Sequence, residues 1–205
     1  MALDIAIAVA GHRYTLGDVL CQPGDVLYLA LEDNPRRLHK RMKKILGDND
    51  WPDRLTFECE WPLLDKGGVD NIRDWIEEAT EPKLVIIDTL AKVRGSRDER
   101  DTSYDADYRV MKDLHSLASE IGIAIVLVHH VRKMDADDPL DTVSGTTGLT
   151  GAADSILVLS KGANGVTLYG RGRDIEEIET AIRFNKNSCR WIAQGNADDV
   201  HRTST

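Results

Sequence analysis

Three short apolar runs are the clearest feature of the hydrophobic pattern along the chain. They are Val26–Leu31, Leu84–Ile87 and Ile123–Val128. A continuous apolar run of this length is typical of a strand that is buried on both faces of a sheet. Ser155–Leu159 predicts a fourth strand, and Leu55–Glu58 predicts a short one. The pattern therefore indicates a largely buried sheet.

The segments between these runs have apolar residues at helical spacing. An alanine-rich start and three apolar stripes predict helices, at Leu3–Ala10, Leu38–Leu46, Ile72–Ala79 and Val110–Ile121. Asn34-Pro35 marks the beginning of the second helix, because proline is favoured in a first helical turn. Strands that alternate with helices predict an α/β fold, a mostly parallel sheet flanked by helices with right-handed crossovers.

The C-terminal part has a different pattern. Three shorter strands joined by turns are predicted there, and we expect them to form an antiparallel extension: Val166–Tyr169, Ala181–Phe184 and Arg190–Ala193. The last residues, from Asn196 to Thr205, are polar, and we expect them to fray. The predicted organisation is one core over residues 1–195 and a polar tail over 196–205.

Composition narrows the class of protein. The 205 residues are 41% hydrophobic and 30% charged, which is ordinary for one globular domain. No apolar run approaches the roughly 20 residues of a membrane helix, and the start lacks a secretory pattern, so we expect a cytoplasmic protein. The three cysteines are widely spaced, which argues against a disulfide scaffold or a zinc finger.

The charge pattern excludes one class of nucleic-acid binding. A net charge of −9 is incompatible with a general basic coat. Arg36–Lys44 nevertheless carries six Lys and Arg residues, for which the ordinary interpretation is a solvated helix face. Residues 133–151 are rich in Asp, Gly, Thr and Ser and predict a long loop, and loops of this length are often functional.

Polar residues directly follow each of the three buried runs: Glu32-Asp33, Asp88-Thr89 and His129-His130. Ligands of such folds bind at the carboxyl ends of the strands, so the three pairs together predict a site. Leu84–Asp88 has the form of a Walker B segment, in which a carboxylate at a rigid strand end holds a Mg²⁺-bound water. Alone this signal is weak, because apolar runs that end in Asp are common.

The other two strand ends allow more than one interpretation. Glu32 could position an attacking water, while Glu32 or Asp33 could instead favour the start of the following helix. His129 and His130 point in opposite directions if they continue a strand, and no further Cys or His cluster supports a metal site. A polar sensor that touches a γ-phosphate fits them better, the alternative being one core-facing and one loop-facing histidine.

Five segments carry a resemblance when they are taken in order: Leu27–Arg37, Val85–Leu90, Val128–Lys133, Ser144–Asp154 and Gly170–Asp174. Together they resemble the RecA-like AAA ATPases of phage and plasmid replication modules. These are similar to the plasmid RepA hexameric helicases, and more distantly to DnaB-type helicases and RecA. The resemblance covers nearly the whole chain, and its specificity comes from the combined order.

The resemblance implies ATP and Mg²⁺ as cofactors and assigns roles around them. It makes Asp88 the Walker B aspartate and metal ligand, with Thr89 beside it at the nucleotide. It makes Glu32 the glutamate that activates water. It makes His130, and less directly His129, the polar sensor.

The resemblance also implies partners. Arg171 and Arg173 match a basic pair that reaches the nucleotide of a neighbouring subunit, which implies a homo-oligomeric ring such as a hexamer, or a ring with a longer homologue. The residues alone are equally compatible with an exposed turn. Weak binding of single-stranded DNA is implied for two loops, near Arg94–Arg100 and Lys133–Thr150, with the candidate contacts Arg94, Arg97, Arg132 and Lys133.

One departure from the family is serious. The sequence contains no G-x-x-x-x-G-K-[ST] phosphate loop, which the family carries immediately before the helix at Leu3–Ala10. We expect the first strand and the phosphate loop to be missing, and the missing strand to belong inside the sheet, next to the Asp88 strand. We also expect this chain to be inactive in ATP hydrolysis by itself.

Several functional hypotheses therefore remain open. The chain is either a shortened form of a longer helicase-type ATPase or a short paralogue without turnover, and the retention of Glu32, Asp88, His130 and Arg173 favours the first. A non-catalytic partner at the ring interface of a full-length homologue, and a regulatory RecA-like ATPase without a DNA role, are the alternatives.

Overall fold

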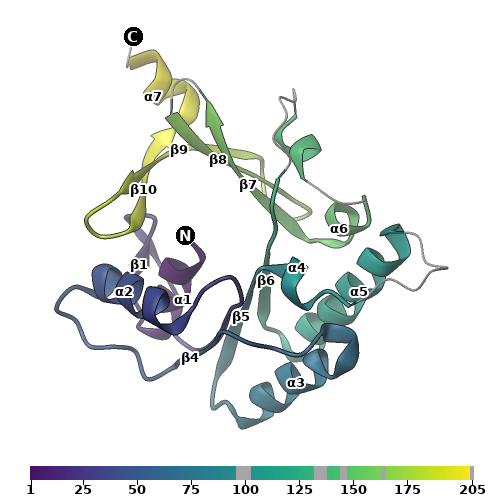
Figure 1. Ribbon diagram of the computed structural model, residues 1–205. Coiled ribbons are helices and arrows are strands. Elements are labelled where there is room, and N and C mark those ends of the chain that lie inside the picture. The colour runs from purple at the N-terminus through teal and green to yellow at the C-terminus, as the bar shows by residue number, and fades with distance from the viewer. Residues whose placement is uncertain (96–102, 132–137, 144–146, 163–164, 204–205) are drawn as a thin grey trace.

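Two four-stranded sheets organise the chain (Figure 1). The computed structural model describes residues 1–95, 103–131, 138–143, 147–162 and 165–203. One sheet is parallel and has helices on both faces, and the other is antiparallel and is formed by the C-terminal strands. The predicted fold class is confirmed.

The parallel sheet has the strand order β4-β3-β5-β6. Its strands are β3 (Asp25–Ala30), β4 (Leu55–Glu58), β5 (Pro82–Asp88) and β6 (Ala124–Val128), which confirms the strands predicted in these regions. Ala30 pairs with Asp88, and Asp88 pairs with Val128. The carboxyl ends of β3, β5 and β6 are therefore level with one another.

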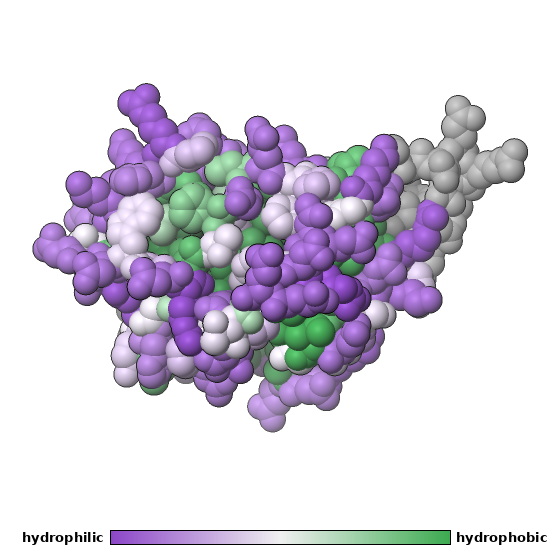
Figure 2. Space-filling view, turned by 90° about the horizontal axis from the view of Figure 1, so that it is seen from below, coloured by the Kyte–Doolittle hydropathy of each residue, from purple (hydrophilic) through white to green (hydrophobic). Residues whose placement is uncertain are grey.

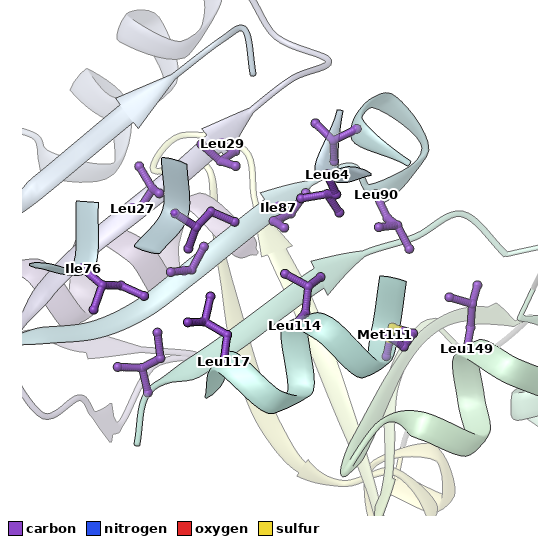
Figure 3. Packing of buried hydrophobic residues seen from close by; sticks show 14 residues of the cluster. Leu27, Leu29, Leu64, Ile76, Ile87, Leu90, Met111, Leu114, Leu117 and Leu149 are labelled. Atoms are coloured by element: carbon purple, nitrogen blue, oxygen red, sulfur yellow. The ribbon is translucent and has the colours of Figure 1, made fainter. Parts of the chain in front are cut away.

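Helices cover both faces of this sheet. One face packs against α1 (Ala2–Ala10) and α2 (Pro35–Leu46), and the other packs against α3 (Gly68–Glu78) and α5 (Ser103–Ile121). Alternate residues of β3 divide between them, since Val26 and Tyr28 face α1 and α2, while Leu27 and Leu29 face α3 and α5. Figure 3 shows the second cluster, in which Leu27, Leu29 and Ile87 lie opposite Leu114 and Leu117 of α5.

The antiparallel sheet has the order β10-β9-β8-β7. Its strands are β7 (Ser155–Gly162), β8 (Gly165–Gly172), β9 (Ile178–Asn185) and β10 (Arg190–Asn196). The first of these confirms the strand predicted at Ser155–Leu159, and it pairs antiparallel with β8. Val158 is buried while Leu157 and Leu159 are exposed, the alternation of a strand with one buried face.

The open edge of the parallel sheet lies elsewhere than expected. The strand that ends in Asp88 is paired on both sides, with β3 and with β6, so no space for a missing strand exists beside it. The expectation of a gap at that position is wrong. Within the described residues β6 pairs only with β5, which leaves β6 at the edge of the sheet.

The sequence patterns did not predict several short elements. A hairpin of β1 (Tyr14–Thr15) and β2 (Val19–Leu20) follows α1, and α4 (Leu90–Val93) follows β5. The stretch expected to be a loop contains two short helices, η2 (Pro139–Thr142) and α6 (Thr147–Ala152), and η1 (Leu64–Lys66) precedes α3. The tail expected to fray instead forms α7 (Ala197–Thr203), where Ala197 is buried.

One face of the molecule carries mainly hydrophilic residues (Figure 2). Figure 2 shows one face on which hydrophilic residues surround smaller hydrophobic patches. Among the described residues, none of the helices combines the length and the apolar character needed to cross a membrane.

A buried ion pair connects the beginning of the chain to the antiparallel sheet. Asp4 of α1 is 2% exposed, and its carboxylate accepts hydrogen bonds from Arg190 Nε at 2.8 Å and from Thr15 Oγ1 at 3.0 Å. Arg190 also donates to the backbone oxygen of Tyr14. The network therefore joins α1, the β1–β2 hairpin and β10.

We expect Arg190→Ala to lower the free energy of unfolding by about 2–4 kcal/mol, because it leaves the Asp4 carboxylate buried without its charged partner. Urea unfolding followed by circular dichroism measures this change. Arg183→Ala, at an exposed position of β9, is the matched control and should change stability by less than about 0.5 kcal/mol. Equal effects of the two substitutions would show that the ion pair between Asp4 and Arg190 does not stabilise the fold.

Candidate functional site

The level strand ends bring three side chains into contact. Glu32 and His130 each lie two residues beyond a register partner of Asp88, on either side of β5. Thr89 Oγ1 donates a hydrogen bond to Glu32 Oε1 at 3.0 Å, and His130 Nε2 lies 3.4 Å from the same oxygen. Residues that are far apart in the sequence therefore form one polar group.

Glu32 is held in its charged form. The hydrogen bond from Thr89 is the largest influence on its pKa and lowers it, and the hydrogen bond and charge of His130 act in the same direction. The side chain is 41% exposed, so water reaches it. An accessible carboxylate with one oxygen fixed by Thr89 and His130 has the features of a group that orients water.

Asp88 is oriented by a buried tyrosine. Tyr28 is 1% exposed, and its hydroxyl donates to Asp88 Oδ2 at 2.7 Å. Burial and the negative charge of Asp88 raise the pKa of Tyr28, so the hydroxyl keeps its proton. Sequence analysis missed Tyr28, because it lies inside an apolar run whose other members form the core.

Asp33, the carboxylate next to Glu32 in the sequence, binds helix α2. It forms ion pairs with Arg37 and Arg41 on α2, while the side chain of Asn34 caps that helix by accepting from Arg37 N at 2.9 Å. The two alternatives for Glu32-Asp33 thus apply to one residue each. Asp33 anchors the following helix, and Glu32 faces Thr89 and His130.

A small cavity lies between the ends of β3 and β5 and the arginines of α2. Its volume is about 200 Å³, and it is lined by Ala30, Glu32, Asp33, Arg37, Arg41 and Asp88. The amino group of Met1 lies close enough to Asp88 to interact electrostatically: burial lowers the pKa of this amino group, while Asp4 and Asp88 raise it. The Met1 amino group, directly before α1, is therefore near the Asp88 side of the site.

The residues present suit a hydrated magnesium ion better than a protein-caged metal. No group of three or more His, Cys, Asp or Glu side chains with metal-binding geometry occurs in the part of the chain that the structure describes. Mg²⁺ commonly takes one or two carboxylates and completes its shell with water and substrate phosphates. Asp88 with the adjacent Thr89 hydroxyl fits that use, whereas a glycine-rich phosphate cradle is absent from the sequence.

The two histidines differ in position. His130 is the more exposed and reaches Glu32, and its side chain is 70% exposed. His129 is half-buried. The structure thus brings His130 into the group at the strand ends, and the sensor role of His129 stays a prediction.

The predicted basic pair lies at the end of β8, with Arg171 inside the strand and Arg173 just beyond it. Arg171 belongs to β8, forms ion pairs with Asp138 at 3.0 Å and with Glu177, and lies over the ring of Tyr169. These contacts hold Arg171 within its own chain. Arg173 is more open, with a side chain that is 58% exposed and 3.5 Å from Asp154.

Of the candidate DNA-binding residues, only Arg94 lies within the described residues. Arg94 is half-buried at the C-terminal end of α4. Arg97, Arg132 and Lys133 lie outside the described residues.

Comparison with known families identifies the chain. The model of the AAA domain family matches residues 1–136, which include all of the parallel sheet, Glu32, Asp88 and His130. The chain belongs to the AAA domain family. A search of curated protein sequences gives no significant match.

Solved structures place this AAA domain among RecA-like folds. It is similar to the ATPase domain of a phage protein, with 15% identity, a TM-score of 0.65, and coverage of 83% of this chain and 75% of the other. A DnaB-like replicative helicase gives 14% identity and a TM-score of 0.66, and 82% of this chain spans 50% of that protein. A KaiC-like protein from Pyrococcus horikoshii OT3 gives 15% identity and a TM-score of 0.51, with coverage of 83% and 76%. At these identities the likeness shows the fold.

We expect Thr89→Val to raise the pKa of Glu32 in this AAA domain, because the variant keeps the shape of residue 89 but removes its donor. The folded-state pKa of Glu32 is depressed, so the hydrogen bond stabilises the fold above the unfolded pKa. That contribution is lost as the pH falls through the folded-state pKa. Carboxyl ¹³C NMR titration measures the pKa, and urea unfolding across the same pH range measures the stability.

Thr89→Ser is the matched control, because it retains the hydroxyl and should leave the pKa of Glu32 low. An unchanged pKa of Glu32 in Thr89→Val would show that the hydrogen bond does not set it.

Proposed function

We propose that this AAA chain is the core of a RecA-like replication ATPase that couples ATP hydrolysis to single-stranded DNA. The observation that carries this proposal is the contact of Glu32 with Thr89 and His130 at the same strand ends as Asp88. These groups supply a water-orienting carboxylate, a metal-binding carboxylate and a polar sensor within one site, as phosphoryl transfer to water requires.

Glu32 is the proposed acceptor for the attacking water. Its carboxylate is ionised at neutral pH, and Thr89 and His130 both contact Oε1. The second oxygen, Oε2, is then the atom that accepts a hydrogen bond from water and takes up its proton. His130 would report the state of the γ-phosphate to the segment that follows β6.

Asp88 is the proposed magnesium ligand. The hydroxyl of Tyr28 occupies Oδ2, which leaves Oδ1 to bind the ion or one of its water molecules. When bound, Mg²⁺ neutralises charge on the nucleotide phosphates. Tyr28 therefore acts as a positioning residue for this carboxylate.

The phosphate loop is the part that this sequence does not supply. Without backbone N–H groups and a lysine around the phosphates, we expect little ATP binding and no turnover by the 205-residue chain. The Met1 amino group lies near Asp88, which suits a phosphate loop placed directly before α1. A ring-interface partner without turnover is the alternative that the absence of this loop favours.

The proposed assembly is a ring on DNA. Two proteins of similar fold motivate this proposal, one being the phage ATPase domain and the other the DnaB-like replicative helicase. Arg173, exposed just beyond the end of β8, would reach a neighbouring nucleotide, together with Arg171. The DNA contacts would come from Arg94, Arg97, Arg132 and Lys133, with an affinity that falls steeply with salt.

The first experiment measures Mg·ATP binding by calorimetry. We expect the 205-residue chain to bind too weakly to detect, and a version with a G-x-x-x-x-G-K-[ST] strand–loop segment ahead of Met1 to bind and hydrolyse ATP. In that version Glu32→Gln should lower the hydrolysis rate at least about 100-fold with little change in ATP affinity, because only the proton acceptor is removed.

Glu58→Gln, at the exposed end of β4, is the matched control and should keep full turnover. Micromolar binding by the 205-residue chain would show that another nucleotide site exists. Retained hydrolysis in Glu32→Gln would remove Glu32 from the mechanism.

A second experiment tests Arg173 in the same extended version. Arg173→Ala should abolish hydrolysis when all subunits carry it. Mixing with Glu32→Gln subunits should restore part of the activity, because an interface that takes Glu32 from the Arg173→Ala subunit and Arg173 from the Glu32→Gln subunit is complete. Steady-state ATPase assays over a range of mixing ratios measure this rescue. A defect that mixing never relieves would place Arg173 in its own subunit's chemistry.

A further inference from the structure

The outer side of α2 carries a stripe of cations. Arg36, Lys40, Lys43 and Lys44 follow the spacing i, i+4, i+7 and i+8, and all four are exposed. Leu38, Met42 and Leu46 form the buried stripe on the opposite side. Over nine residues the cationic stripe spans about 12 Å, at about 1.5 Å per residue.

The charges of this stripe are not neutralised by other residues that the structure describes. In the described ranges, none of the four side chains takes part in an ion pair, whereas Arg37 and Arg41 of the same helix both bind Asp33. The helix has no acidic residue, although acidic residues would stabilise its first turn, where Arg36 lies. Lys43 and Lys44 lie in the last turn, where cations stabilise a helix, so helix stability explains these two cations but not Arg36 and Lys40.

An aromatic pair borders the stripe. His39 lies between Arg36 and Lys43 on the helix surface, at i+3 from one and i−4 from the other. Its ring packs on the ring of Trp51, with 4.8 Å between the centroids, and Trp51 is 39% exposed. A large, partly exposed indole ring thus contacts the histidine that lies between Arg36 and Lys43.

We propose that the outer side of α2, together with Trp51, is a second binding surface for single-stranded nucleic acid. The stripe is long enough to face three to four phosphates of a strand that keeps helical stacking, at about 3.4 Å of axis per phosphate. The exposed part of Trp51 offers a stacking surface for one base, and an aromatic beside a basic groove is the usual combination for sequence-tolerant single-strand binding. This surface is distinct from the loops named above and does not depend on the ATP site.

The aromatic pair and the cations together favour one kind of anionic partner. Exposed tryptophan also occurs at protein interfaces, but an acidic protein face supplies carboxylates without rings that alternate with them. A nucleic-acid strand uses both features, because it presents phosphates and bases in alternation.

Fluorescence anisotropy of a labelled oligothymidylate with the 205-residue chain tests this surface. The variant with Arg36, Lys40, Lys43 and Lys44 all changed to Gln should lose at least about tenfold in affinity at low salt. Its slope of log K against log salt should become shallower by up to about 3, at about 0.7 per phosphate contact. The matched control changes Lys66, Lys112, Arg183 and Lys186 to Gln, which gives the same net charge and should bind within about twofold of the unchanged chain.

Trp51 provides a second, direct readout. Oligothymidylate should quench the fluorescence of Trp51, and Trp51→Phe should remove this quenching and weaken binding about fivefold or more. Circular dichroism checks that each variant is folded.

Three results would overturn the proposal. They are no binding by the unchanged chain at low salt, equal binding by the two four-residue variants, and competition by polyglutamate as strong as by oligothymidylate. If both four-residue variants bind oligothymidylate as tightly as the unchanged chain, the DNA contacts belong to the loops instead. None of these results bears on ATP binding, which calorimetry reports separately.

Discussion

The parallel register of β3, β5 and β6 determines both the core and the site. Because Ala30, Asp88 and Val128 are level, the residues just beyond them meet at one edge of the sheet. The same register places Tyr28 on the face of α1 and α2, where its hydroxyl reaches Asp88. A slip of one residue in β3 would turn Tyr28 toward α3 and separate Glu32 from Thr89.

Helix α2 serves three purposes with three sides. Leu38, Met42 and Leu46 bury one side against the sheet, Arg37 and Arg41 on the flank bind Asp33, and the outer side carries the cationic stripe. Asp33 thus fixes the rotation of α2 about its own axis. Adjacent carboxylates at the end of β3 are therefore not interchangeable, since Asp33 orients a helix while Glu32 remains accessible to water.

Local patterns predicted the buried strands well and the connections between them less well. The runs at β3, β5 and β6 are apolar because both of their faces are covered, so the residues after each run could be assigned to one sheet edge. Tyr28 could not be assigned to the site, since only its pairing with Asp88, 60 residues away, reveals its role. The run of β7 resembles a doubly buried strand in sequence, and its single buried face depends on β8. Strand order likewise depends on tertiary contacts, which explains why the open edge was expected beside Asp88 and lies at β6.

The Asp4–Arg190 ion pair also has a consequence for the order of events during synthesis. The two residues are 186 positions apart, so a growing chain exposes α1 long before its guanidinium partner exists. At about 5–20 residues per second, this interval is on the order of 10–40 s. During that time burial of Asp4 would carry the cost of an unpaired charge, which disfavours docking of the first turn of α1. The first helix, α1, therefore completes its packing only after β10, the last strand of the antiparallel sheet, has been synthesised.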